Sequence, residues 1–139
     1  MASALIDASA MVAAFGRNQP KREHYHELLQ LAALETWSLS TTWPCVVEAG
    51  YLVDPPERYA LLRWIGEGAV SVFPFGQEAL LDMLPWMQRY TEAPRTEMDL
   101  ADASLYALAA DTGINRIMTL DVRDFSRYRL PDGRSFEIL

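Results

Sequence analysis

Cysteine, histidine and lysine are scarce in this sequence of 139 residues. The single cysteine, Cys45, has no partner for an internal disulfide, so a disulfide-stapled scaffold is excluded and a reducing cytoplasm is the expected compartment. His24 and His26 stand two positions apart, on different faces of a helix, and we expect polar surface residues and not a zinc site. No apolar run approaches the roughly 20 residues that span a bilayer, so no membrane contact is expected.

The sequence motifs of common nucleotide-binding and hydrolase sites are missing as well. The chain contains no GxSxG, no GxxxxGK[ST] and no GxGxxG. Acidic side chains outnumber basic ones by 19 to 12, and the net charge of -7 argues against a protein that coats nucleic acid through a broad basic surface. The same excess permits a site at which clustered carboxylates hold a cation.

Predicted strands and helices alternate along one domain that spans residues 1–139. Short apolar or β-branched runs predict strands over 3–7, 37–42, 69–75, 115–121 and 136–139. Apolar residues at helical spacing, with Pro20 and Gly113 as end signals, predict helices over 8–15, 20–35, 44–53, 55–68, 76–93 and 99–113. This alternation indicates an α/β fold, with helices on both faces of a short, mostly parallel sheet of four to five strands.

Four acidic residues recur where predicted strands end or predicted helices begin: Asp7, Glu48, Asp102 and Asp121. In a parallel sheet, the carboxyl ends of the strands and the adjoining helix N-termini line the usual ligand crevice. A right-handed parallel topology would therefore bring the four carboxylates to one edge. An aspartate that follows a strand is also an ordinary helix N-cap, and this alternative stays open for Asp7 and Asp121.

The two aspartates of the stretch MDLADASLYALAA differ in their structural roles. Asp99 occupies the N-cap position of the predicted helix, and Asp102 occupies its third position. The residues at 105, 106 and 109 share a face with Asp102 and are apolar, so we expect this face to point toward the core. Glu48 is likewise the only charge in an apolar run, and burying either charge without a partner is costly.

A divalent cation would resolve the repulsion among converging carboxylates. Neighbouring carboxylates raise one another's pKa, and a bound cation offsets that effect. Oxygen ligands alone favour Mg²⁺ or Mn²⁺ over zinc, which prefers histidine and cysteine. The sequence therefore predicts one or two Mg²⁺ or Mn²⁺ ions among Asp7, Glu48, Asp102 and Asp121.

Three blocks follow one another in the order LIDASAMVA, WPCVVEAGYLV and MDLADASLYALAADTGINRIMTLDVRDF. Together they resemble the PIN-domain family, and especially the VapC-like toxins of bacterial toxin–antitoxin pairs. The resemblance implies a PIN-like three-layer α/β/α sandwich and a metal-dependent ribonuclease. The family's acids fall on Asp7, Glu48, Asp102 and Asp121, and its auxiliary site positions fall on Asp99, Asp124, Ser9 and Thr119.

Hydrolysis of an RNA phosphodiester is the reaction that this site would perform. The metal orients a water and favours its hydroxide form, so no side-chain nucleophile is required. Glu48 or Asp121 could instead relay a proton, and the sequence does not separate ligand from base. Arg116, Arg123 and Arg127 are the candidates for binding the substrate, with a solvated surface face as an equally open alternative.

The resemblance also implies protein partners. Residues 55–91 would contribute to a homodimer and to a groove for a cognate antitoxin, with core packing as the alternative for each residue. Two other functions stay open, a non-catalytic PIN-like RNA-binding domain and a receiver-like signalling domain. A receiver domain needs a lysine at its acidic site, and Lys21 is far from any predicted strand end, whereas the presence of all four acids favours catalysis.

Overall fold

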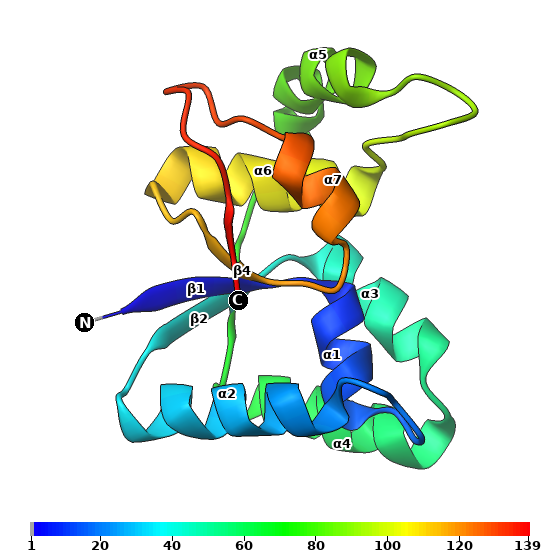
Figure 1. Cartoon of the computed structure of the whole chain (residues 1–139), viewed down its shortest axis with the longest axis vertical. Coiled ribbons are helices and arrows are strands. Elements are labelled where there is room, and N and C mark those ends of the chain that lie inside the picture. The colour runs from blue at the N-terminus through cyan, green and yellow to red at the C-terminus, as the bar shows by residue number, and fades with distance from the viewer. Residues whose placement is uncertain (1) are drawn as a thin grey trace.

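The computed structural model describes residues 2–139 and places five strands between layers of helices (Figure 1). The strands are β1 (Ser3–Ile6), β2 (Ser38–Thr41), β3 (Ser71–Val72), β4 (Arg116–Met118) and β5 (Glu137–Ile138). The helices are α1 (Ala8–Phe15), α2 (Arg22–Leu34), α3 (Trp43–Leu52), α4 (Pro55–Gly66), α5 (Ala79–Tyr90), α6 (Leu100–Thr112) and α7 (Val122–Arg127). The predicted α/β fold with a short parallel sheet is confirmed.

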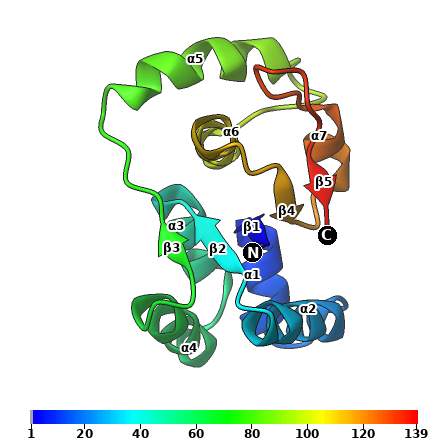
Figure 2. The ribbon, with the colours of Figure 1, turned by 90° about the vertical axis from the view of Figure 1, so that its left-hand side faces the viewer.

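The sheet has the strand order β3-β2-β1-β4-β5, and all neighbouring strands are parallel (Figure 2). The chain begins in the centre with β1, moves outward through β2 and β3, and then returns to place β4 on the other side of β1. The strand order therefore reverses between β1 and β4, and a ligand crevice forms at the carboxyl ends of the strands beside such a switch point. Asp7 directly follows β1, and Asp121 follows β4 after two residues.

Helices cover both faces of the sheet (Figure 1). On one side α1 packs against α2, α3 and α4, and on the other side α6 packs against α5. Helix α3 also contacts α6, and a buried hydrogen bond of 2.6 Å between the Thr42 and Ser104 hydroxyls ties the start of α3 to α6. No helix within residues 2–139 has both the length and the apolar character needed to cross a membrane.

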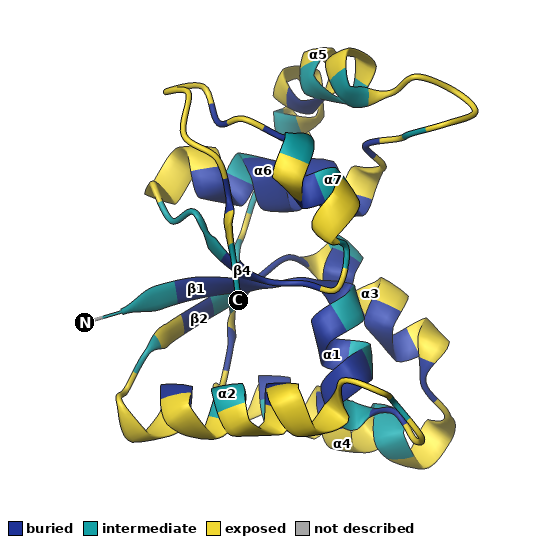
Figure 3. Cartoon of the chain, in the orientation of Figure 1, coloured by how far each residue is buried: buried dark blue, intermediate teal, exposed yellow. Residues whose placement is uncertain are grey.

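The core is centred on β1, whose residues Ala4, Leu5 and Ile6 are fully buried. This is expected for a parallel strand with helices on both faces. Helix α6 is buried along most of its length, whereas α5 outside it is largely exposed (Figure 3). Asp102 therefore projects from one of the most tightly packed elements of the molecule.

Several elements are shorter than expected, such as β4 at Arg116–Met118 for the strand expected over 115–121, and two short elements differ most. Helix α7 was not predicted, because its six residues include Arg123, Asp124 and Arg127 and show no apolar period. The strand expected over 69–75 shrinks to the two residues of β3. Its hydrogen bonding to β2 stops after Phe73, since Pro74 cannot donate a hydrogen bond to a sheet. Neither difference moves a predicted acidic residue away from the carboxyl edge of the sheet.

Candidate metal centre

An acidic cleft of about 340 Å³ lies at the switch point between β1 and β4. Its charged lining comprises seven acidic and two basic residues: Asp7, Glu48, Glu97, Asp99, Asp102, Asp121, Asp124, Arg95 and Arg123. All four acids singled out in the sequence thus line one cleft. A larger cavity of about 460 Å³ between α1, α2 and α4 has a mainly apolar lining with Glu57 as its one acid, so cavity size alone does not locate the acidic site.

Asp7 is buried at the start of α1, and both of its carboxylate oxygens accept hydrogen bonds. Its Oδ1 accepts from the Ala8 backbone N–H (2.7 Å), which makes it the N-cap that the alternative interpretation allowed. Its Oδ2 accepts from the hydroxyls of Thr119 (2.7 Å) and Ser9 (3.1 Å). Burial raises the pKa of Asp7, and these hydrogen bonds counteract the rise. The hydroxyls of Ser9 and Thr119, both predicted as auxiliary site residues, therefore hold the carboxylate of Asp7, which follows β1.

The aspartates at the start of α6 divide as expected from their spacing. Asp99 is exposed and caps the helix, and its Oδ1 accepts from the backbone N–H of Asp102 (2.9 Å). The Asp102 side chain is buried, and its Oδ2 accepts from the Tyr128 hydroxyl (2.6 Å). Burial raises the pKa of Asp102 to about 8, and the Tyr128 hydrogen bond partly counteracts it. The fully buried Leu105 and the buried Tyr106 confirm that this face points into the core.

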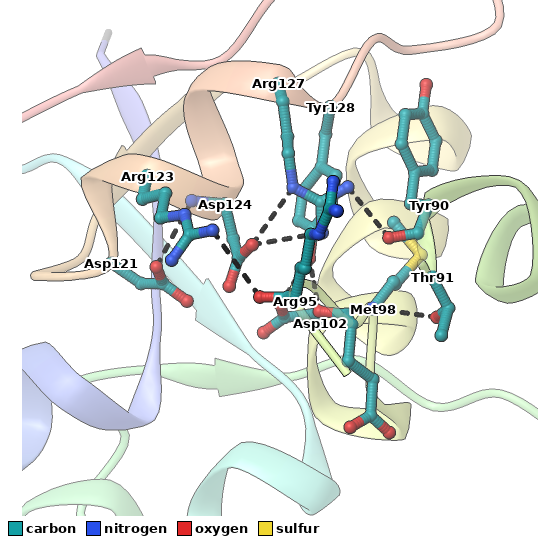
Figure 4. A network of polar contacts seen from close by, with 11 residues as sticks. Tyr90, Thr91, Arg95, Met98, Asp102, Asp121, Arg123, Asp124, Arg127 and Tyr128 are labelled. Atoms are coloured by element: carbon teal, nitrogen blue, oxygen red, sulfur yellow. Dashed lines mark hydrogen bonds and ion pairs between the residues drawn. The ribbon is translucent and has the colours of Figure 1, made fainter. Parts of the chain in front are cut away.

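Asp121 and Asp124 face Asp102 from the first turn of α7 (Figure 4). Asp121 caps this helix, with its Oδ1 accepting from the Asp124 backbone N–H (3.2 Å), and burial raises the pKa of Asp121 to about 6. One carboxylate oxygen from each of Asp102, Asp121 and Asp124 lies within 4.8 Å of the others. Three converging carboxylates form a donor set that fits a hard divalent cation. Asp124, which the family resemblance made only an auxiliary site residue, therefore belongs to this group of three converging carboxylates.

Glu48 lines the same cleft from α3. The expectation that it lies on a buried, apolar face of this helix is wrong. Its apolar neighbours Tyr51 and Leu52 are 82% and 58% exposed, and Glu48 itself is exposed. This face of α3 therefore meets solvent, and no burial forces a partner on the carboxylate. Partial desolvation, followed by the charges of Asp99 and Asp7, still raises the pKa of Glu48.

The three arginines predicted to bind substrate take different positions. Arg123 lines the cleft. Arg127 contacts the site through Asp124, whose Oδ1 accepts from its Nε (3.0 Å), and it also donates to the Tyr90 carbonyl (2.7 Å). Arg116 stands at the start of β4, away from the carboxyl edge, over the Trp37 ring (4.6 Å) and near Glu137 (3.9 Å). Arg116 is thus not brought to the cleft.

Arg95 is a cleft residue that was not predicted from the sequence. It lies in the segment between α5 and α6, and its backbone carbonyl accepts from the Arg123 side chain (3.4 Å). Within residues 2–139, the ion pairs involve neither Arg95 nor Arg123. Because Arg95 follows no strand and lies on no predicted helix face, no periodic signal in the sequence could have placed it at the site.

Comparisons with known proteins agree with this architecture. No curated protein matches the sequence. A solved structure with a similar fold is the VapC20 toxin of Mycobacterium tuberculosis, which cleaves the sarcin–ricin loop; the TM-score is 0.72 at 15% sequence identity, over 87% of this chain and 92% of that one. At this identity the similarity shows the fold alone. The family model of the PIN domain matches residues 4–130, and the chain therefore belongs to the PIN-domain family.

Proposed function

We propose that this protein is a Mg²⁺- or Mn²⁺-dependent endoribonuclease and the toxin of a bacterial toxin–antitoxin pair. The observation that carries the proposal is the convergence of the Asp102, Asp121 and Asp124 carboxylates within 4.8 Å, in an acidic cleft of a PIN-domain chain. The fold similarity to a VapC toxin supports the toxin assignment. A receiver-like domain is not supported, since the PIN-domain family model matches residues 4–130 and Lys21 is not among the residues that line the acidic cleft.

Asp7, Glu48, Asp102 and Asp121 are the proposed metal ligands, and Asp124 joins them because of its place in the acidic group. A bound ion would supply a water of lowered pKa and would offset charge on the scissile phosphate. Among these acids Glu48 is exposed, and partial burial together with the charges of Asp99 and Asp7 raises its pKa. Its access to solvent suits a proton acceptor.

Arg95 and Arg123 are the proposed contacts to the RNA backbone. Both line the cleft, and in the described part of the chain neither forms an ion pair with an acid. An unpaired guanidinium can bind a phosphate through two parallel hydrogen bonds. The two arginines would hold the phosphates beside the scissile bond, while the acidic floor of the cleft remains for the metal.

Protein partners are proposed from exposed apolar side chains within residues 55–91. On α4 these are Tyr59 and Leu62, and on α5 they are Leu80, Leu81 and Leu84, all at least 44% exposed. Helices α4 and α5 lie at opposite ends of the molecule, so these side chains form two separate surfaces (Figure 1). Neighbouring exposed apolar side chains, such as the three leucines of α5, are typical of sites of protein association. We propose that these surfaces serve the homodimer and the cognate antitoxin.

Light scattering of the isolated protein tests the homodimer. It should give twice the chain mass of 15.7 kDa, and the chain mass alone would contradict the homodimer.

Cleavage of RNA by the purified, antitoxin-free protein tests the activity. Mg²⁺ or Mn²⁺ should support cleavage of total RNA or of a sarcin–ricin-loop oligonucleotide, and excess EDTA should stop it. Asp7→Asn should abolish the cleavage, because it removes a proposed ligand. Cleavage that persists in the variant would point to a contaminating nuclease, and a protein that cuts no RNA with either metal would contradict the proposal.

A further inference from the structure

The hydroxyl of Tyr128 makes the shortest hydrogen bond to any carboxylate of the cleft. It donates to Oδ2 of Asp102 at 2.6 Å, and both side chains are buried. An O–H donor at this distance from an ionised carboxylate, the form of Asp102 that a bound cation would favour, makes a strong, charge-assisted bond. The bond joins two elements that are distant in sequence, since Asp102 lies in the first turn of α6 and Tyr128 ends α7.

The three acids that converge in the cleft share one pattern of hydrogen bonds (Figure 4). Oδ2 of Asp102 accepts from Tyr128, Oδ1 of Asp124 accepts from Arg127, and Oδ1 of Asp121 accepts from the Asp124 backbone N–H. Within residues 2–139, these bonds from Tyr128, Arg127 and the Asp124 backbone each reach one oxygen of a carboxylate, and the side chains of Asp121 and Asp124 also interact with each other. Each acid is thus held through one oxygen and offers an oxygen to the group of three.

The Tyr128 ring is itself fixed from several sides. Phe125 and Tyr90 meet it edge to face, each with ring centroids 5.1 Å away, and the guanidinium of Arg127 lies 5.0 Å above it. The ring is completely buried. A donor fixed in this way restricts the rotation of the Asp102 carboxylate, which a solvent water would not do.

We infer that Tyr128 is a positioning residue, whose hydroxyl holds one oxygen of Asp102 and aims the other at the metal ion. This inference rests on the proposed function, because it assigns Tyr128 a role toward the ion that the acids would bind. Removing a side chain that hydrogen-bonds to a metal ligand and orients it typically weakens metal binding by about 10- to 100-fold. Tyr128 itself would contact neither the ion nor the RNA.

The test compares Tyr128→Phe with Tyr106→Phe in the full chain. Tyr106 is a matched control, because it is also buried and its hydroxyl donates to the Arg129 carbonyl and not to an acid. Mn²⁺ affinity is measured without RNA, from the electron paramagnetic resonance signal of free Mn²⁺. We expect about 10-fold weaker binding in Tyr128→Phe and wild-type binding in Tyr106→Phe, with similar unfolding temperatures for the two variants.

Two further measurements separate positioning from a merely structural role. Raising the Mn²⁺ concentration about 10-fold should restore RNA cleavage by Tyr128→Phe, and in an Asp102→Asn background the Tyr128→Phe change should weaken Mn²⁺ binding no further. Equal Mn²⁺ affinity in wild type and Tyr128→Phe would overturn the role of Tyr128 and leave the proposed function standing. A wild-type protein that binds no Mn²⁺ would overturn both.

Discussion

In the metal-free protein, ionisation of the buried Asp102 carboxyl group lowers the free energy of unfolding. The residue is 8% exposed, and burial raises the pKa of its carboxyl group from 3.8 to about 8. Between these two pH values the folded chain retains a proton that the unfolded chain has already released. The free energy of unfolding of the metal-free protein therefore falls as the pH rises through this window. Asp7 and Asp121, whose pKa values are also raised, contribute with the same sign.

A urea-unfolding series in EDTA between pH 5 and pH 8 checks this prediction. The free energy of unfolding should decline with rising pH, and Asp102→Asn should remove up to about 1.4 kcal/mol per pH unit from that slope, because it deletes one titrating group. Adding Mg²⁺ should oppose the decline, since a bound cation replaces the proton. An identical slope in wild type and Asp102→Asn would contradict the burial of a titrating carboxyl at this position.

At the scale of elements, α6 is held at both ends by residues that the sequence already identified. Asp99 caps its N-terminus through a 2.9 Å bond to the Asp102 backbone N–H, and Gly113 ends it with a φ of 79°. Such a left-handed conformation favours glycine. These local signals explain why a helix predicted over 99–113 is found at Leu100–Thr112.

Substitutions of Asp99 test how much its N-cap stabilises α6. Asp99→Ala should lower the free energy of unfolding by about 1 kcal/mol, because a backbone N–H of the first turn loses its acceptor. Asp99→Asn should lower it much less, since asparagine is an equally good N-cap. Chemical denaturation of both variants provides the measurement. A similar loss in both would indicate that the charge of Asp99, and not its cap, stabilises the helix.

Elements without local signals could not be placed from the sequence. The contact between Tyr128 and Asp102 spans 26 residues, and the segment that carries Arg95 has no periodic pattern. The surroundings of Glu48 were misjudged for a related reason, because an apolar run does not reveal whether the fold covers that helix face. The acids at strand ends were predictable, since parallel topology brings them together whatever the details of packing.

At the scale of the whole molecule, a net charge of -7 has to be reconciled with a polyanionic substrate. Five of the seven acidic side chains that line the cleft are proposed ligands of a cation that would offset their charge, and Arg95 and Arg123 are the two basic residues of its lining. Two phosphate contacts predict a shallow salt dependence of RNA affinity, with a slope of log K against log salt of about -1.4 for a single strand.

Substitution of these arginines tests that expectation. Arg95→Ala and Arg123→Ala should each weaken RNA binding and reduce the salt slope by about 0.7, because each removes one phosphate contact. Arg63→Ala is the matched control, as Arg63 is exposed on α4 and does not line the cleft. Fluorescence anisotropy with labelled RNA across a salt series gives both quantities. A control variant that changes the slope as much as the cleft variants would show that binding depends on total charge alone.

RNA cleavage by Asp102→Asn and Asp99→Asn, measured side by side over a Mn²⁺ titration, tests the central claim most directly. The two acids stand three positions apart on one helix, but only Asp102 belongs to the group of three converging carboxylates. We expect Asp102→Asn to lose cleavage by at least about 100-fold and Asp99→Asn to stay within about 10-fold of wild type. Full cleavage by a folded Asp102→Asn protein would contradict a metal-dependent ribonuclease built on this cleft.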